Sequence, residues 1–340
     1  MSEARRTTIV DVARVAGVSY KTVSRVLNGE PHVKADLQER VRTAAKELNY
    51  HPNVLAQGLV RQRSYLVGLV SENPSSSYGY ELQMGVLDRL KTERYRLVVV
   101  PVGSASEHGG EVVAILRSAA LDGVMLAPPA ADHPLILDQL KAVRMPFARI
   151  APTRLLDIGY NNLVDDVAAA REIARHVLAL GHTDIGIIKG DPTHHSSEAR
   201  LIGYSQAMQE HGVAVRLDRI EQGYYTFDSG LHAARRLLAG PSRPTAILSQ
   251  NDDMAVGALL AARELGMAVA ADLTIAGFDD SEFSRMVWPR LTTVRQPVFD
   301  MARSAADMLI AQLERHTVTR QVVHSHTLIL RESAGPPRTV

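Results

Sequence analysis

The sequence contains no cysteine and only one tryptophan among its 340 residues. The absence of cysteine excludes disulfide bonds and thiolate metal sites. No apolar run approaches the roughly 20 residues that span a bilayer. The N-terminal stretch "MSEARRTTIVDVARVAG" also lacks the apolar segment of a secretory signal. We therefore expect a cytoplasmic protein that has no membrane partner.

The sequence also lacks the short motifs that mark common enzymes, since GxGxxG, the P-loop and GxSxG are all absent. The adjacent acids Asp252-Asp253 and Asp279-Asp280 rarely point into one site. The neighbouring His194-His195 has no acidic or thiol partners at the spacing of metal ligands. We predict that the protein is not an enzyme and that it holds no cofactor and no metal.

The formal net charge is only +1, but it is unevenly spread along the chain. Residues 1–63 hold 11 Lys and Arg against 6 Asp and Glu, and the remainder holds 27 against 31. A basic N-terminal segment on a slightly acidic body indicates contact with a polyanion. A solvated basic helix surface would give the same counts, so charge alone leaves both interpretations open.

The basic segment has the pattern of a helix-turn-helix unit. Apolar spacing predicts a helix in "TIVDVARVAG" that ends at Gly17, a second helix capped by Ser19, and a third from Ala35 to Leu48. In such a unit the second helix lies in the DNA major groove, and Arg25 can pair with guanine in bidentate fashion. The alternative is a small helical bundle with a polar face. The predicted DNA contacts on this helix are Ser19, Tyr20, Lys21, Thr22, Ser24 and Arg25.

Short apolar strands alternate with amphipathic helices from Tyr65 onward. The strands include "YLVGLV", "RLVVVPV", "GVMLA", "DIGIIKG" and "TAILSQ", and the last is "VVHSHTLIL". This alternation predicts parallel sheets that are covered by helices on both faces. Two such halves indicate two lobes with a cleft between them.

The sequence resembles the lactose-repressor/galactose-repressor family of bacterial transcription regulators. The stretches "TIVDVARVAGVSYKTVSRVLNGEPHV", "LNYHPNVLAQGL", "ALGHTDIGIIKGD", "PTAILSQNDDMAVGAL" and "WPRLTTVRQP" carry the resemblance over nearly the whole chain. The resemblance implies a DNA-binding head, a hinge helix and a two-lobed body like a periplasmic sugar-binding protein. It also implies a homodimer on near-palindromic operator DNA.

We therefore predict an N-terminal all-α helix-turn-helix domain followed by an α/β two-lobed, periplasmic-binding-protein-like effector domain. No heptad segment follows "RESAGPPRTV", so we expect a dimer and not a zippered tetramer. The predicted parts are the DNA-binding domain (1–52), the hinge helix and linker (53–64) and the effector-binding domain (65–335), with a first lobe of 65–163 and 295–320 and a second lobe of 164–292 and 321–331.

The predicted hinge helix, Asn53–Arg61, is too short to be stable alone, because isolated helices below about 12–15 residues are marginal in water. Gly58 weakens it by a further ~1 kcal/mol relative to alanine. We expect it to order only when it has partners. The resemblance assigns Leu59 to wedging into the minor groove and kinking the duplex; ordinary linker packing is the alternative. The remaining predicted DNA contacts are Thr8, Asn28, His32 and Asn53.

The resemblance identifies Arg200 as the arginine that grips a small-molecule effector. Asn251 and Asp279 each follow a predicted strand, where ligands bind in open α/β sheets. An arginine, an amide and a carboxylate together suit vicinal hydroxyls. For Arg200 and Asp279, the alternative to effector binding is a salt bridge between the two in an empty cleft. For Tyr225, the alternative is packing in the core. The full predicted effector site is Asn73, Ser196, Arg200, Tyr225, Asn251 and Asp279.

These observations predict a repressor of carbohydrate-use genes that a small sugar, a mono- or disaccharide, releases from a palindromic operator. The alternative is a corepressor-type regulator that responds to a nucleobase or a sugar phosphate. A transport receptor and a sugar-modifying enzyme are two further classes; the basic head argues against the receptor. Val298 stands where some family members place an aromatic residue against the ligand, so the effector's identity cannot be carried over.

Overall fold

The computed structural model describes residues 7–27, 31–50, 63–72, 77–102 and 105–338. The chain divides into two compact units, Met1–Tyr65 and Leu66–Val340. The predicted hinge helix and the predicted contacts Asn28, Asn53, Leu59 and Asn73 lie outside the described residues. Within the described ranges, no helix combines the length and the apolar character that crossing a membrane requires.

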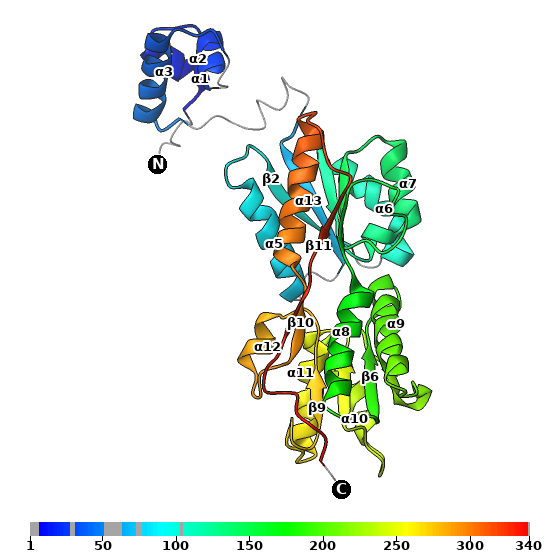
Figure 1. The fold of residues 1–340 in the computed structure, drawn as a ribbon. Coiled ribbons are helices and arrows are strands. Elements are labelled where there is room, and N and C mark those ends of the chain that lie inside the picture. Colours follow the sequence, from blue (N-terminus) through cyan, green and yellow to red (C-terminus); the bar gives the residue numbers. More distant parts are fainter. Residues whose placement is uncertain (1–6, 28–30, 51–62, 73–76, 103–104, 339–340) are drawn as a thin grey trace, which may run out of the picture. The chain divides into compact units, whose positions relative to one another are not determined.

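The described residues of the N-terminal unit form three helices, as the apolar spacing predicted (Figure 1). They are α1 (Ile9–Ala16), α2 (Tyr20–Leu27) and α3 (Ala35–Glu47). Their apolar faces meet in one small core of valine and alanine side chains. The buried residues of this core are Val12, Ala13, Ala16, Val23, Val26, Val41, Ala44 and Ala45.

The turn between α1 and α2 depends on Gly17 for two reasons. Its φ of 64° lies in the left-handed region, where a residue without Cβ is favoured. A Cβ on Gly17 would also lie 2.7 Å from Nη2 of Arg40. That guanidinium donates a 2.7 Å hydrogen bond to the Ala16 carbonyl, which helix α1 leaves unpaired at its end. Arg40 therefore stabilises the N-terminal unit internally.

The first lobe of the second unit is built on a six-stranded parallel sheet of order β11-β5-β4-β3-β1-β2 (Figure 1). Its strands are β1 (Leu66–Glu72), β2 (Arg96–Val102), β3 (Gly123–Leu126), β4 (Phe147–Ile150), β5 (Asn161–Val164) and β11 (Gln321–His324). Helices α5 (Ser77–Leu90) and α13 (Val298–Leu313) pack against each other. Helices α6 (Ala105–Ser118) and α7 (Pro134–Ala142) also pair, and their buried side chains join those of β1, β2 and β3 in one core.

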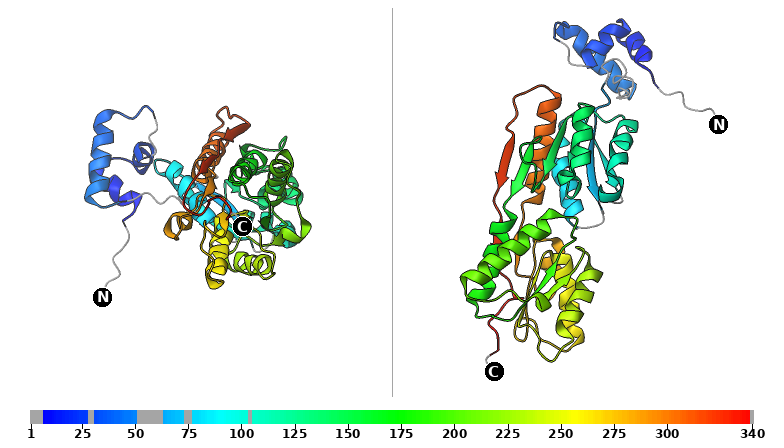
Figure 2. Two further views of the ribbon diagram at one scale, coloured as in Figure 1. Left: turned by 60° about the horizontal axis from the view of Figure 1, so that its bottom comes forward. Right: turned by 90° about the vertical axis from the view of Figure 1, so that its right-hand side faces the viewer.

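The second lobe has a four-stranded parallel sheet of order β7-β6-β8-β9 between two helix pairs (Figure 2). Its strands are β6 (Ile185–Lys189), β7 (Ile220–Gln222), β8 (Ala246–Ser249) and β9 (Thr274–Ala276). The helix pairs are α8 (Asp166–Ala179) with α9 (His195–Glu210), and α10 (Phe227–Leu238) with α11 (Asp252–Glu264). Helices α8 and α9 approach so closely that a Cβ on Gly203 would lie 2.3 Å from the Val167 carbonyl oxygen.

The C-terminal segment corrects two expectations. The single final strand predicted in "VVHSHTLIL" is two strands, β11 and β12 (Thr327–Ile329). Strand β11 pairs with β5 in the first lobe, although we assigned residues 321–331 to the second lobe. Strand β12 pairs antiparallel with β10 (Thr293–Arg295). The strand breaks because its two halves complete different sheets.

Two other elements had no strong apolar signal. Strand β5 begins with Asn161 and Asn162, which are fully buried. Their amides are satisfied internally; for example, Nη1 of Arg149 donates to Oδ1 of Asn161 over 3.1 Å. The short helix α12 (Glu282–Met286) buries only Ser284. Apolar periodicity does not predict strands with buried polar residues or helices of a single turn.

Candidate DNA-binding surface and effector cleft

Helix α2 presents the predicted base-reading side chains to solvent. Val23 and Val26 are buried against α1 and α3, and Tyr20, Lys21 and Arg25 are exposed. The helix starts at Ser19, whose Oγ accepts a 3.1 Å hydrogen bond from the Thr22 backbone N–H. Thr22 and Ser24 are half-buried. Their DNA contacts, like those of the exposed residues, stay predictions.

Two further predicted contacts also have local backbone roles. Thr8 caps α1 in a capping box with Asp11, and its hydroxyl donates a 2.7 Å hydrogen bond to the Asp11 carboxylate. A contact from Thr8 to DNA phosphate would therefore share its hydroxyl with this cap. His32 is exposed and has a φ of 75° in the turn before α3.

The second unit contains a cleft of about 800 Å³ that both lobes line. Its walls follow the carboxyl ends of strands in both sheets: Ser71 and Glu72 end β1, Asn251 follows β8 and Asp279 follows β9. This is the edge at which open α/β sheets bind ligands. All five predicted effector residues that the structure describes line this cleft: Ser196, Arg200, Tyr225, Asn251 and Asp279.

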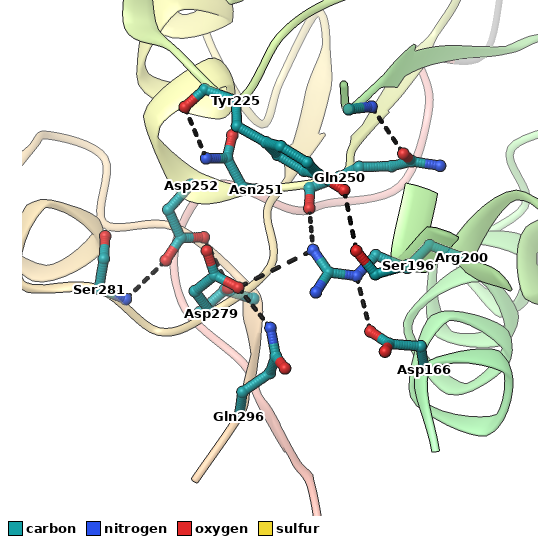
Figure 3. A network of polar contacts seen from close by, with 12 residues as sticks. Asp166, Ser196, Arg200, Tyr225, Gln250, Asn251, Asp252, Asp279, Ser281 and Gln296 are labelled. Atoms are coloured by element: carbon teal, nitrogen blue, oxygen red, sulfur yellow. Dashed lines mark hydrogen bonds and ion pairs between the residues drawn. The ribbon is translucent and has the colours of Figure 1, made fainter. Parts of the chain in front are cut away.

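Arg200 is the centre of a buried polar cluster on the second-lobe wall (Figure 3). Its Nε donates to Oδ1 of Asp166 over 2.8 Å, and its Nη1 donates to the Gln250 carbonyl. Asp279 is more distant, at 3.9 Å from Nη1. The alternative of a mutual Arg200–Asp279 salt bridge is therefore only partly right, because Asp166 is the principal partner.

The charge of Arg200 is held in place by this cluster. Burial alone would lower its pKa, but the Asp166 carboxylate, with further contributions from Tyr225 and Asp279, raises it above its ordinary value. The guanidinium carbon also lies 3.8 Å from the centroid of the Phe278 ring. Arg200 therefore stays a fixed cation whose orientation is set before any ligand arrives.

Asp279 is held in an unusual backbone conformation with its carboxylate toward the cleft. Its φ is 114°, and Nε2 of Gln296 donates a 2.7 Å hydrogen bond to its Oδ1. Burial raises the pKa of Asp279 to about 7, although Arg200 and Gln296 oppose the shift. At neutral pH this group is thus poised between a carboxylate acceptor and a carboxyl donor.

Asn251 and Tyr225 are tied to each other (Figure 3). Oδ1 of Asn251 caps α11 by accepting from the Met254 N–H over 3.0 Å, and its Nδ2 donates to the Tyr225 carbonyl over 3.0 Å. The Tyr225 hydroxyl lies 3.3 Å from Oγ of Ser196, and its ring meets His194 edge-on at 5.3 Å. Asn251 therefore lines the cleft and also fixes the backbone at Tyr225 and at the start of α11.

Sequence reasoning missed several residues of this cleft. Asp166 begins α8 and looks in the sequence like an ordinary helix-starting acid. Asp253, Gln296 and Glu72 also line the cleft, and so does Tyr78 from the first lobe. Burial, together with the Asp279 and Asp166 carboxylates, raises the pKa of the Tyr78 hydroxyl. Only tertiary structure brings these groups together.

An all-α unit with an exposed second helix, joined to a two-lobed unit with a polar cleft, defines a ligand-responsive DNA-binding regulator. Residues 8–53 match the family described as "Bacterial regulatory proteins, lacI family", and residues 174–334 match the "Periplasmic binding protein-like domain". The chain belongs to the LacI family of bacterial transcription regulators.

Individual relatives match over nearly the full chain. Catabolite control protein A of Priestia megaterium is 31% identical over 332 residues, which cover 96% of this chain and 98% of that protein. The repressor PurR of Pectobacterium atrosepticum is 31% identical over 341 residues, which cover 97% and 98%. The Lac repressor dimer bound to operator and the anti-inducer ONPF matches with a TM-score of 0.86 and 28% identity, over 97% of this chain and 100% of that one.

Proposed function

We propose that this regulator represses carbohydrate-use genes and leaves its operator when a saccharide binds in the cleft. The single observation that carries the proposal is the cluster of Arg200, Asp166 and Asp279 on the wall of the 800 Å³ cleft. A fixed cation and a carboxylate beside it supply a donor and acceptors to adjacent hydroxyl groups, which is the pattern that a sugar ring presents.

The coupling to DNA is proposed to run through the hinge helix and linker (53–64) and a dimer interface. Two copies of the chain would set their α2 helices in successive major grooves of a near-palindromic operator. The segment Asn53–Arg61 would form a helix only on DNA, with Leu59 in the minor groove. A saccharide that prefers the DNA-incompetent state of the lobes would shift the equilibrium; reversing a 99:1 balance needs a preference of about 10⁴-fold.

The second candidate function is a regulator that needs its effector in order to bind the operator. It is kept because one relative, from Pectobacterium atrosepticum and 31% identical, is named the repressor PurR. In that case a nucleobase or a sugar phosphate would strengthen operator binding. We also propose that the protein acts in the cytoplasm, where its DNA is, and that it turns over no substrate.

The test begins with selection of an operator from genomic fragments by the full-length protein. Fluorescence anisotropy then measures operator affinity with and without a panel of saccharides and purine bases. We expect one saccharide to weaken operator binding at least tenfold. The Asp279→Asn variant should bind the operator but respond only to higher saccharide concentrations, and Arg25→Ala should bind the operator more weakly. Operator binding that only a purine base changes, or that nothing changes, would overturn the proposal.

A further inference from the structure

The charges around the cleft restrict the chemical class of the effector. Resting on the proposed function, we propose that the effector is an uncharged saccharide of about two sugar rings, and that Asp253 rejects its phosphorylated or carboxylated analogues. Neither the ligand charge nor a role for Asp253 follows from the regulator function alone.

The cleft is lined with carboxylates and has little positive charge to offer. Its acidic side chains are Glu72, Asp166, Asp191, Asp253 and Asp279. Among the lining residues that the structure describes, Arg200 is the single Lys or Arg.

Arg200 cannot easily serve an anionic ligand, because its charge is already balanced. Asp166 lies 2.8 Å from Nε, Asp279 lies 3.9 Å from Nη1, and the Gln250 carbonyl accepts from Nη1. A phosphate or carboxylate at this point would meet the Asp166 carboxylate and the partly ionised Asp279, along with the guanidinium. Like charges brought together in a partly buried site disfavour the complex.

The Asp253 carboxylate differs from the other cleft acids, because no donor among the described residues reaches it. The Asp191 carboxylate accepts from the Thr193 N–H at 2.8 Å, and Asp279 accepts from Gln296. Asp253 is half-buried in the first turn of α11, and its carboxylate has no hydrogen bond or ion pair with any residue in the described ranges. Burial raises the pKa of this carboxyl to about 6. A ligand hydroxyl would satisfy it, and a ligand anion would be repelled.

The cleft is large enough to hold two sugar rings. The roughly 30 Å³ that a water occupies in the liquid is a generous volume per non-hydrogen atom. On that measure a hexose of about 12 such atoms needs about 360 Å³, and a disaccharide of about 23 needs about 700 Å³. The cleft holds about 800 Å³. The aromatic residues that line it and can cover apolar faces of sugar rings are Tyr78, Tyr224, Tyr225, Phe227 and Phe283.

The test uses the full-length protein and isothermal titration with matched ligands. The panel contains glucose and galactose; cellobiose, maltose, lactose and trehalose; glucose 6-phosphate and trehalose 6-phosphate; and cellobionate and lactobionate. We expect a neutral disaccharide to bind about 100-fold more tightly than its anionic counterpart, as like-charge contacts in a binding site typically impose. We expect monosaccharides to bind at least tenfold more weakly than that disaccharide.

Two variants test whether Asp253 causes the preference for neutral over anionic saccharides. Asp253→Asn keeps the shape but removes the charge, and should reduce the neutral-to-anionic ratio about tenfold. Asp228→Asn removes one exposed charge of α10 outside the cleft lining, and should leave the ratio unchanged. An anionic sugar that binds as tightly as its neutral partner, an equally tight monosaccharide, or an unchanged ratio in Asp253→Asn would overturn this inference and leave the proposed function standing. Binding by no saccharide in either arm would overturn both.

Discussion

Replacing Asp279 by asparagine should strengthen the fold while it weakens effector binding. Burial raises the pKa of this carboxyl from 3.8 to about 7, so the charged form is disfavoured in the folded protein. The difference is about 3 pKa units, and at ~1.36 kcal/mol per unit the charged group destabilises the folded state by up to about 4 kcal/mol. Asparagine keeps the shape and an acceptor for Gln296, but it carries no charge to desolvate.

The sign of the pH dependence follows from linkage. An acid with a raised folded-state pKa binds more protons in the folded than in the unfolded protein, so stability falls as pH rises from about 4 to above 7. The penalty is ~1.7 kcal/mol at pH 5 and ~4 kcal/mol at pH 8. The advantage of Asp279→Asn over the wild type should therefore grow by about 2–3 kcal/mol between these pH values.

Urea unfolding of the full chain without ligand, followed by circular dichroism at pH 5, 6, 7 and 8, measures this difference. Asp253 titrates in both proteins, so the difference between them reports position 279 together with its Coulombic coupling to Asp252 and Asp253. The Asp138→Asn control changes a side chain that is 70% exposed and should show no such trend. Effector affinity should fall about 10- to 100-fold, because a hydrogen bond to a charged group contributes ~1.5–3 kcal/mol. A stability difference that is flat with pH, or a variant less stable than wild type at pH 8, would refute the reasoning.

Three further substitutions test other parts of the account. Arg25→Ala should weaken specific operator binding by ~1–3 kcal/mol and relax selectivity at one base pair; equal weakening on all sequences in competition assays would contradict base reading. Arg40→Ala removes the 2.7 Å hydrogen bond to Ala16 and should destabilise α1 by ~1 kcal/mol, seen as faster amide exchange at residues 9–16; unchanged exchange would count against the cap. Gly203→Ala forces a Cβ to 2.3 Å from the Val167 carbonyl oxygen and should lower unfolding free energy by ~1–3 kcal/mol. Its control, Gly240→Ala, has no neighbour nearer than 3.8 Å and should change little.

The elements with strong periodicity were predictable from sequence, because their burial is regular. Helices α1 to α3 and strand β2 fall where the apolar spacing placed them. Strand β5 was missed because its buried Asn161 and Asn162 are satisfied by tertiary hydrogen bonds. The break between β11 and β12 depends on which sheet each half joins, and no local pattern records that choice.

The effector cleft was predictable only in part for the same reason. Arg200 and Asp279 were reached through family resemblance and the rule that ligands lie beyond strand ends. Asp166 was not, because it is 34 residues from Arg200 along the chain and becomes its partner only when α8 packs on α9. That the Asp253 carboxylate has no donor among the described residues is likewise evident only from the three-dimensional structure.

In the proposed function, occupancy of the cleft weakens operator binding, and occupancy of the operator weakens saccharide binding. The most direct measurement is the dissociation constant of the identified saccharide, taken by titration calorimetry on the free protein and again on the operator-bound protein. Linkage requires that the operator weaken saccharide binding by the same factor by which the saccharide weakens operator binding, at least tenfold here. Identical saccharide dissociation constants in the two titrations would show that the cleft does not communicate with DNA.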